Sequence, residues 1–92
     1  MKYTLIFSES ALRHLDEWKK SGQKKILKKI YNLFKELEEH PYTGTGHVEQ
    51  LKGDLSGYWS RHITKGSRMI YSIIEEKITV TIVSMKKHYS DK

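Results

Sequence analysis

The chain has 92 residues, a formal net charge of +6 at pH 7 and no cysteine. A chain of this length buries only roughly 60 to 65% of its unfolded surface, so residues 1–92 are expected to form a single domain around one core. A secreted domain this small usually needs disulfides, and no apolar run is long enough for a membrane span or a signal peptide. We therefore expect a cytoplasmic protein without a membrane partner, and the positive charge predicts a polyanionic partner such as nucleic acid.

The N-terminal segment predicts a strand followed by a helix. Residues 2–7 alternate with a period of two, and the apolar Ile6 on the second face indicates a strand that is covered on both faces or lies mid-sheet. Ser8 is a typical N-cap for a helix over residues 9–20, because its hydroxyl can accept a hydrogen bond from an amide of the first turn. Ser21 and Gly22 end this helix. Its expected inward stripe consists of Leu12, Leu15 and Trp18 with Lys19.

A second helix is expected over residues 23–39, before Pro41. Its apolar residues recur at steps of three and four, which predicts an inward face formed by Ile26, Ile30, Leu33, Phe34 and Leu37. Its first turns carry the lysine cluster, which consists of Lys24, Lys25, Lys28 and Lys29. Like charges four residues apart cost roughly 0.2–0.5 kcal/mol per pair, and these lysines also lie near the positive end of the helix dipole. The cluster is therefore either a solvated face or a surface for phosphates.

The C-terminal half predicts an antiparallel meander after a loop at residues 40–46. Four strands are expected at residues 48–52, 58–64, 67–74 and 78–85, separated by turn-forming residues. Simple alternation in the last strand places Ile78, Val80, Ile82 and Ser84 on one face and Thr79, Thr81, Val83 and Met85 on the other. The expected fold class is α+β, with an N-terminal strand and a two-helix hairpin packed on a twisted, mainly antiparallel sheet.

Three residue types could together cleave RNA without a metal, because that reaction needs a base, a phosphate-neutralising cation and an acid. Glu49 is the candidate base, although the ordinary glutamate pKa of about 4.3 would have to rise for efficient work near pH 7. Arg68 is the candidate phosphate clamp and His88 the candidate acid. Each also has a structural interpretation. Glu49 could be a solvated charge on a strand, Arg68 could pair with a carboxylate across strands, and His88 could lie in a frayed tail.

Supporting residues for RNA binding are drawn from the same region. Lys52, Arg61 and His62 are candidate auxiliary cations, and Tyr89 is a candidate for stacking on a base. No metal or other cofactor is expected, because the five histidines are widely separated, no His-Glu-x-x-His pattern occurs and there is no cysteine.

The densest motif is Leu-Ser-Gly-Tyr-Trp-Ser-Arg-His-Ile at residues 55–63, followed by Arg-Met-Ile-Tyr at 68–71 and His-Tyr at 88–89. With Glu-Gln-Leu-Lys at 49–52, this pattern resembles the YoeB/Txe toxins of bacterial type II toxin-antitoxin systems, within the wider RelE/ParE group. The resemblance implies a RelE-like fold and ribosome-dependent cleavage of mRNA in the A site of the 70S ribosome. It also implies a cognate antitoxin of the YefM/Axe type, and a second copy of the chain is a further candidate partner.

By position, the resemblance gives Glu49 the role of general base, Arg68 that of phosphate stabiliser and His88 that of general acid, supported by Lys52 and Tyr89. His62 stands where relatives often have a second arginine, so this chain has a weaker and pH-dependent phosphate contact there. The lysine cluster would then contact ribosomal RNA. Two alternatives stay open: a non-catalytic ParE-like module that inhibits a partner such as gyrase, and a plain basic domain that binds nucleic acid.

Overall fold

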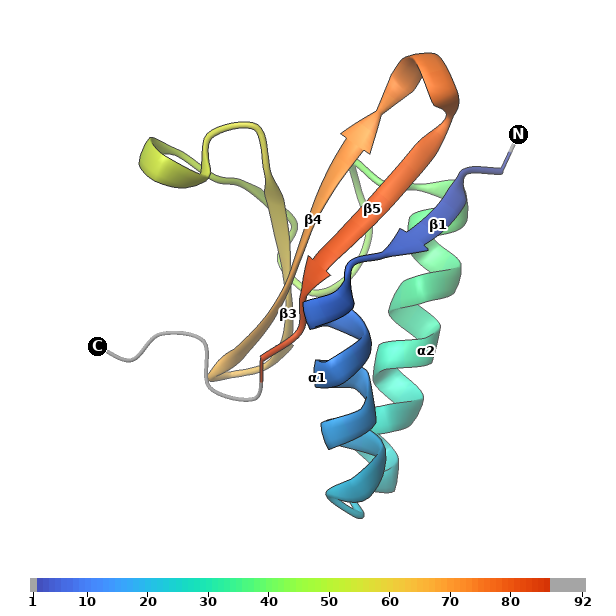
Figure 1. Cartoon of the computed structure of the whole chain (residues 1–92), viewed down its shortest axis with the longest axis vertical. Helices are drawn as coiled ribbons and strands as arrows, with labels where there is room; N and C mark the ends of the chain where they lie inside the picture. Colours follow the sequence, from blue (N-terminus) through green and yellow to red (C-terminus); the bar gives the residue numbers. More distant parts are fainter. Residues whose placement is uncertain (1, 87–92) are drawn as a thin grey trace.

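The computed structural model describes residues 2–86, and within that range it contains a five-stranded sheet and two α-helices (Figure 1). The strands are β1 (Thr4–Phe7), β2 (Glu49–Gln50), β3 (Trp59–Thr64), β4 (Ser67–Ile74) and β5 (Thr79–Ser84), and their order in the sheet is β1-β5-β4-β3-β2. The helices are α1 (Glu9–Lys20) and α2 (Lys24–Glu39), with short 3-10 turns at Gly53–Leu55 and Glu75–Lys77. The expected α+β class is confirmed.

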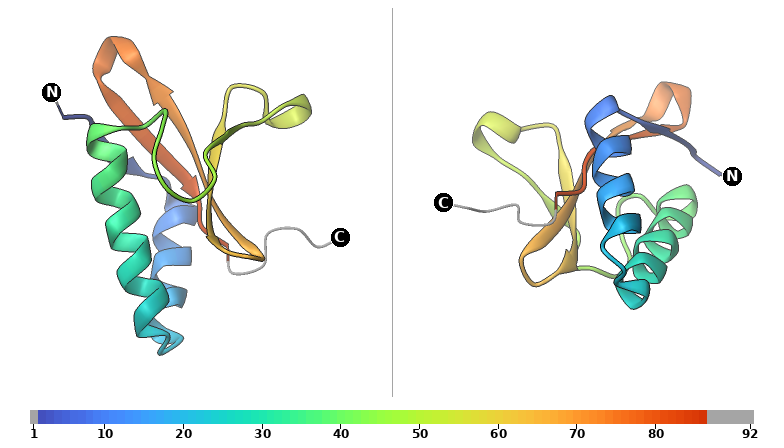
Figure 2. Two further views of the ribbon diagram at one scale, coloured as in Figure 1. Left: turned by 180° about the vertical axis from the view of Figure 1, so that it is seen from behind. Right: turned by 60° about the horizontal axis from the view of Figure 1, so that its bottom comes forward.

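Both α-helices lie against the same face of the sheet, and the segment around Gly53–Leu55 projects on the opposite side (Figures 1 and 2). β2 to β5 form an antiparallel meander, as predicted, while β1 pairs in parallel with β5. In the described part of the chain the sheet therefore has one helix-covered face and one helix-free face.

β1 is an edge strand with one exposed face, so the expectation of a strand covered on both faces or lying mid-sheet was wrong. Its pairing places Leu5 opposite Val80 and Phe7 opposite Ile82, so these residues face the helices. Ile6 pairs with Thr81 on the other face and is 49% exposed. The apolar character of Ile6 thus reflects strand propensity more than burial.

α1 begins and ends as predicted, and Leu15 and Trp18 face the core as expected, but Leu12 does not. The Ser8 hydroxyl caps the helix by accepting a hydrogen bond from the Ala11 amide at 3.0 Å. The buried positions are Ala11, His14 and Trp18, whereas Leu12 is 53% exposed. The expected stripe was wrong at Leu12, because the register with the sheet follows the positions i, i+3 and i+7 that start at Ala11.

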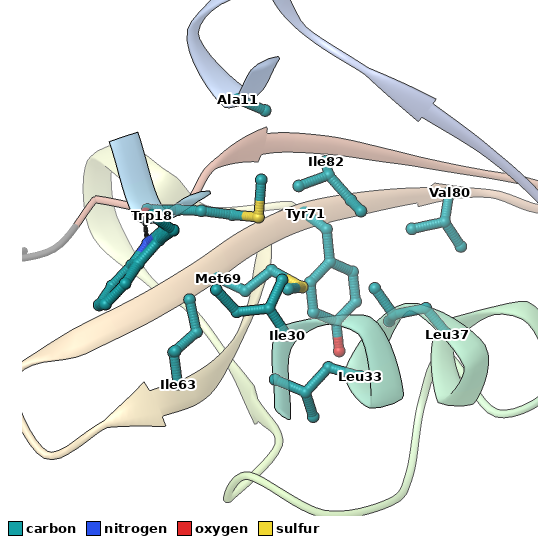
Figure 3. Packing of buried hydrophobic residues seen from close by; sticks show 11 residues of the cluster. Ala11, Trp18, Ile30, Leu33, Leu37, Ile63, Met69, Tyr71, Val80 and Ile82 are labelled. Carbon is teal, nitrogen blue, oxygen red and sulfur yellow. Dashed lines mark hydrogen bonds between the residues drawn. The ribbon is translucent and has the colours of Figure 1, made fainter. Parts of the chain in front are cut away.

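α2 buries Ile30, Leu33 and Leu37 against the sheet, as its periodicity predicts. Phe34 is half-buried and packs edge-to-face on Phe7 with ring centroids 5.2 Å apart. Figure 3 shows Ile30, Leu33 and Leu37 near core side chains of the sheet, namely Met69, Tyr71, Val80 and Ile82. No helix in residues 2–86 is long and apolar enough to cross a membrane.

A bulge in β5 reverses the expected alternation near its end. Tyr71 pairs with Ile82 but Ile70 pairs with Ser84, so one extra residue of β5 stands opposite β4. An extra residue shifts the following side chains to the other face. Ser84 consequently shares a face with Ile70, and Met85 joins Ile82 in the core, which corrects the prediction that Met85 and Ile82 face opposite ways.

Candidate active site on the helix-free face of the sheet

The strand register gathers the predicted site residues of the sheet on the helix-free face. Glu49 pairs with Ser60, and His62 pairs with Arg68. Directly opposed residues in an antiparallel pair point to the same side, as do residues two apart along a strand. Glu49, His62 and Arg68 therefore share one face, and the core residues Ile63 and Met69 lie on the other.

Glu49 lies on β2, which is only two residues long where five were expected. It is exposed. The Leu51 amide donates to the Tyr58 carbonyl at 2.9 Å, which extends the contact with β3 beyond the two paired residues. Lys52 follows at the start of the projecting turn Gly53–Leu55 and is also exposed. A carboxylate and an ammonium group thus stand close together in sequence at the edge of this face.

Arg68 and His62 form the cationic centre of the helix-free face. Both side chains are half-buried, and they are direct cross-strand neighbours. The His47 ring lies beside His62, with ring centroids 5.5 Å apart. His47 has a positive φ of 59°, which is uncommon for a residue other than glycine, and the preceding Gly46 carbonyl accepts a hydrogen bond from the His62 amide at 2.5 Å. The loop before Glu49 is therefore tied to β3 at His62.

His47 and Ser60 were not among the residues expected at this site. His47 was counted only as an isolated histidine, and the contact with His62 depends on the loop conformation, which the sequence does not specify. Ser60 lies directly opposite Glu49, and its hydroxyl is buried without a hydrogen-bond partner among residues 2–86. Alternation along the strand predicted at residues 58–64 was the signal that could have found Ser60, because it places Ser60 on the same face as His62.

Arg61 does not belong to this face, and the expectation that it contacts RNA is corrected by its burial. Its side chain has no exposed surface, since β3 alternation turns it toward the helices. Its guanidinium pairs with the Glu36 carboxylate at 2.7 Å and donates to the His40 and Thr43 carbonyls at 2.5 and 2.7 Å. All of these partners precede Glu49 in the chain. Arg61 therefore fixes the loop that leads into β2.

Glu36 and Tyr71 complete the Arg61 network. Burial disfavours ionisation of Glu36, but hydrogen bonds from Thr45 and the charge of Arg61 outweigh it and lower the pKa of the carboxyl group. The Tyr71 hydroxyl accepts from Arg61 Nε at 3.1 Å and donates to the Pro41 carbonyl at 3.0 Å. Burial raises the pKa of Tyr71, so it stays neutral and can donate. The network links α2, β3, β4 and the loop over residues 40–46.

The lysine cluster lies away from Glu49 and Arg68. All four lysines are exposed on the first two turns of α2, in the helical layer behind the sheet (Figure 2). The N-cap residue Gln23 makes no side-chain capping bond, and the first turn contains no acidic residue. Nothing in this turn offsets the repulsion among the lysines, and the structure does not bring them together with the helix-free face.

The remaining predicted site residues, His88 and Tyr89, lie outside the described residues. The last described residue is Lys86. The pairing of β4 with β5 ends at Ile70 and Ser84, two residues before Lys86. Within residues 2–86 there is no group of three His, Cys, Asp or Glu side chains that could hold a metal ion.

Comparison with known proteins identifies relatives across most of the chain. Residues 7–89 match the model of the YoeB-like toxins of bacterial type II toxin-antitoxin systems. Toxin YoeB of Synechocystis is 40% identical over 72 residues, which cover 78% of this chain and 81% of the relative. Toxin YoeB of Escherichia coli K12 is 36% identical over 85 residues, or 92% and 98% of the two chains. The mRNA interferase toxin RelE of the same organism is 30% identical over 87 residues, or 95% and 84%.

Solved structures have the same fold. A YoeB/ParE toxin from Agrobacterium tumefaciens superimposes with a TM-score of 0.85 at 29% identity, covering 94% of this chain and 99% of that one. The toxin chain of a heterotetrameric YoeB-YefM toxin-antitoxin complex from Staphylococcus aureus gives a TM-score of 0.78 at 31% identity, covering 97% and 100%. A YoeB dimer from the same species gives 0.79 at 31% identity, with the same coverage.

Proposed function

This chain belongs to the YoeB-like toxin family of bacterial type II toxin-antitoxin systems, and we propose that it is an endoribonuclease that cleaves mRNA in the ribosomal A site. The observation that carries the proposal is the placement of Glu49, His62 and Arg68 on one helix-free face of the sheet. A carboxylate on β2 and a guanidinium on β4, the two strands that flank β3, suit an RNA backbone, since one can move a proton and the other can hold a phosphate.

In the proposed mechanism Glu49 takes the proton from the 2'-hydroxyl of the nucleotide before the scissile phosphate. The resulting alkoxide attacks phosphorus, and the 5'-oxygen of the next nucleotide leaves with a proton from His88. The products are a 2',3'-cyclic phosphate and a 5'-hydroxyl. Each proton transfer by a positioned side chain contributes about 10²- to 10⁴-fold to the rate. The reaction as written moves protons between side chains and RNA and needs no metal ion.

Arg68 is proposed to stabilise the pentacoordinate phosphorane. A guanidinium presents parallel N–H donors that match two phosphate oxygens, and it keeps its charge at every pH of interest. His62 faces the same space from β3 and is proposed as a second, pH-dependent contact to phosphate. Lys52 is proposed to contact a neighbouring phosphate, and Tyr89 is proposed to stack on a base.

The role of His88 is supported by chain connectivity. β5 pairs with β4 as far as Ser84 and Ile70, and Ile70 is two residues from Arg68 on β4. His88 follows Ser84 by four residues in the sequence. This short connection from the strand next to β4 supports the proposal that His88 is the acid.

Three partners follow from the family and from the relatives. We infer the ribosome and its mRNA as substrate, a YefM-like antitoxin as inhibitor, and a second copy of the toxin as a partner in the free state. The lysine cluster would bind ribosomal RNA on the helical side of the molecule, where its exposed positive charge favours phosphates. In this arrangement the helix-free face would receive the mRNA.

Analysis of the cleavage products tests the proposed chemistry. Programmed ribosomes are incubated with the toxin in the presence of enough Mg²⁺ to keep them intact, and the ends of the mRNA fragments are mapped. The proposal expects a 2',3'-cyclic phosphate and a 5'-hydroxyl. A 5'-phosphate would rule out 2'-hydroxyl attack, and the absence of any cleavage would instead favour the non-catalytic ParE-like alternative.

A further inference from the structure

Helix α1 continues the hydrogen bonding of the β5 edge after β1 has ended. β1 pairs with β5 up to Phe7 and Ile82. The next residue, Ser8, donates its amide to the Ile82 carbonyl at 2.9 Å and its hydroxyl to the Val83 carbonyl at 3.0 Å. From there on, side chains of α1 take the place of a neighbouring strand.

The last of these contacts is a pair of hydrogen bonds to the backbone of Met85. The Met85 amide donates to His14 Nδ1 at 3.0 Å, and Trp18 Nε1 donates to the Met85 carbonyl at 2.7 Å. His14 and Trp18 are four residues apart on one face of α1, and all three residues are buried. We call this arrangement the Met85 clamp; Figure 3 shows the Trp18 part of it.

The bulge in β5 makes the clamp effective. It turns the Met85 side chain into the core, beside Ile82, while the backbone N–H and C=O point to α1. Met85 is therefore held by its side chain and by both of its backbone polar groups. These contacts fix the chain one residue beyond the end of β5 at Ser84.

The clamp requires particular chemistry from both side chains. His14 must be neutral, with an unprotonated Nδ1 to accept the bond, and Trp18 must supply its indole N–H. Burial lowers the pKa of His14, with smaller opposing and supporting effects from Glu17, Arg13 and Lys86, and this favours the neutral form. Packing alone would need neither the acceptor nor the donor.

We propose that His14 and Trp18 are positioning residues for catalysis, which hold the end of β5 and so fix the point from which the chain continues to His88. The inference rests on the proposed function, in which His88 is the general acid. Neither residue touches RNA in this account. Their effect is on the placement of the acid, and a displacement of about 1 Å can reduce a catalysed rate by up to about 100-fold.

Two substitutions of His14 separate positioning from packing. In His14→Asn the amide oxygen takes the place of Nδ1 and can still accept from Met85, whereas in His14→Gln the oxygen is one bond farther out. Both side chains are polar amides of the same kind, so the pair is matched for chemistry. Trp18→Phe keeps an aromatic ring and removes the donor.

The readouts are the single-turnover cleavage rate at saturating toxin, the affinity for the ribosome and amide hydrogen exchange at Met85. We expect His14→Gln to cleave about 10-fold or more slowly than His14→Asn, with ribosome affinity unchanged within about twofold and faster exchange at Met85. Trp18→Phe should cleave as slowly as His14→Gln. Equal cleavage rates for His14→Asn and His14→Gln, with faster hydrogen exchange at Met85 only in His14→Gln, would overturn the positioning role of His14. A wild-type cleavage rate in Trp18→Phe would overturn that of Trp18.

His14→Leu and His88→Ala complete the design. His14→Leu removes the acceptor at similar volume and should resemble His14→Gln if it folds; the amide pair decides the question if it does not. A wild-type rate for His88→Ala would show that the proposed function is wrong. A slow His88→Ala enzyme combined with equal rates for the His14 pair would leave the proposed function intact and refute the clamp alone.

Discussion

Replacing Arg61 with methionine should destabilise this protein far more than replacing an exposed cation. The guanidinium is fully buried and joins the Glu36 carboxylate, the His40 and Thr43 carbonyls and the Tyr71 hydroxyl. Methionine fills similar space but offers no donor. Its substitution would leave a carboxylate and several buried acceptors without their partner.

The size of the effect follows from that burial. Removing one partner of a buried ion pair costs about 3–5 kcal/mol. The Glu36 side chain is 28% exposed, so water recovers part of the lost interaction and the lower figure of about 3 kcal/mol applies. In a domain of this size 1 kcal/mol shifts the melting temperature by about 4–8 °C, which gives a decrease of roughly 12–24 °C.

Urea and thermal denaturation followed by circular dichroism measure this change. Arg61→Lys keeps the charge but lacks the planar set of donors, so we expect it to fall between wild type and Arg61→Met. The matched control is Lys65→Met, an exposed cation at the β3–β4 turn, which should change stability by less than about 0.5 kcal/mol. If Arg61→Met were as stable as this control and had lost only RNA binding, the structural role argued above would be refuted.

Three further predictions address other parts of the molecule. A methyl group at Gly44 would lie 2.5 Å from Glu36 Oε1 and 2.6 Å from Arg61 Nη1, so Gly44→Ala should lower the free energy of unfolding by about 2 kcal/mol or more. The control is Gly53→Ala, which should lower it by about 1 kcal/mol, because φ is also positive at Gly53 but the space around it is open. The pKa of His14 is lower in the folded state than in the unfolded chain, so the unfolded chain is protonated first and stability should fall as pH drops below about 6.5. Urea denaturation at pH 7.5 and 5.5 measures this fall, which should be smaller in His14→Asn. Reversing all four charges of the lysine cluster to glutamate should abolish ribosome association and leave the melting temperature near that of wild type, and retained binding in a pelleting assay would contradict the proposed role of the cluster.

The fold was largely predictable because its elements have clear periodicity and strong end signals. Ser8 and Pro41 mark helix ends, and β4 has the predicted bounds. β2 was overestimated, since only Glu49 and Gln50 pair with β3. A pattern of alternating residues does not reveal how many of them find a partner strand.

The wrong predictions of which side chains face the core have specific physical causes. The β5 bulge inverts alternation after Ile82, and nothing in the residues 78–85 signals the extra residue. Leu12 was expected to face the core because it is apolar, but it is exposed, whereas the polar His14 is buried and accepts a hydrogen bond from the Met85 amide. Propensity scales cannot anticipate a buried histidine whose partner lies 71 residues away in sequence.

The candidate site was predicted from residue types and family resemblance, and the structure changes which residues belong to it. The register supports grouping Glu49 with Arg68 and His62. Arg61 was predicted to be an auxiliary cation for RNA, but strand alternation and five acceptors around its guanidinium place it in the interior. His47 enters the site through a loop conformation with positive φ that the sequence does not encode in any simple pattern.

The most direct test of the account is the single-turnover rate of mRNA cleavage on programmed ribosomes by Glu49→Gln and Arg68→Ala. Glu49→Gln keeps the shape of the side chain and removes its basicity, and Glu76→Gln is the control at another exposed glutamate. We predict rates at least about 100-fold below wild type for Glu49→Gln and Arg68→Ala, with normal ribosome binding, and a wild-type rate for the control. Wild-type cleavage by Glu49→Gln and Arg68→Ala would contradict the assignment of the active site to the helix-free face.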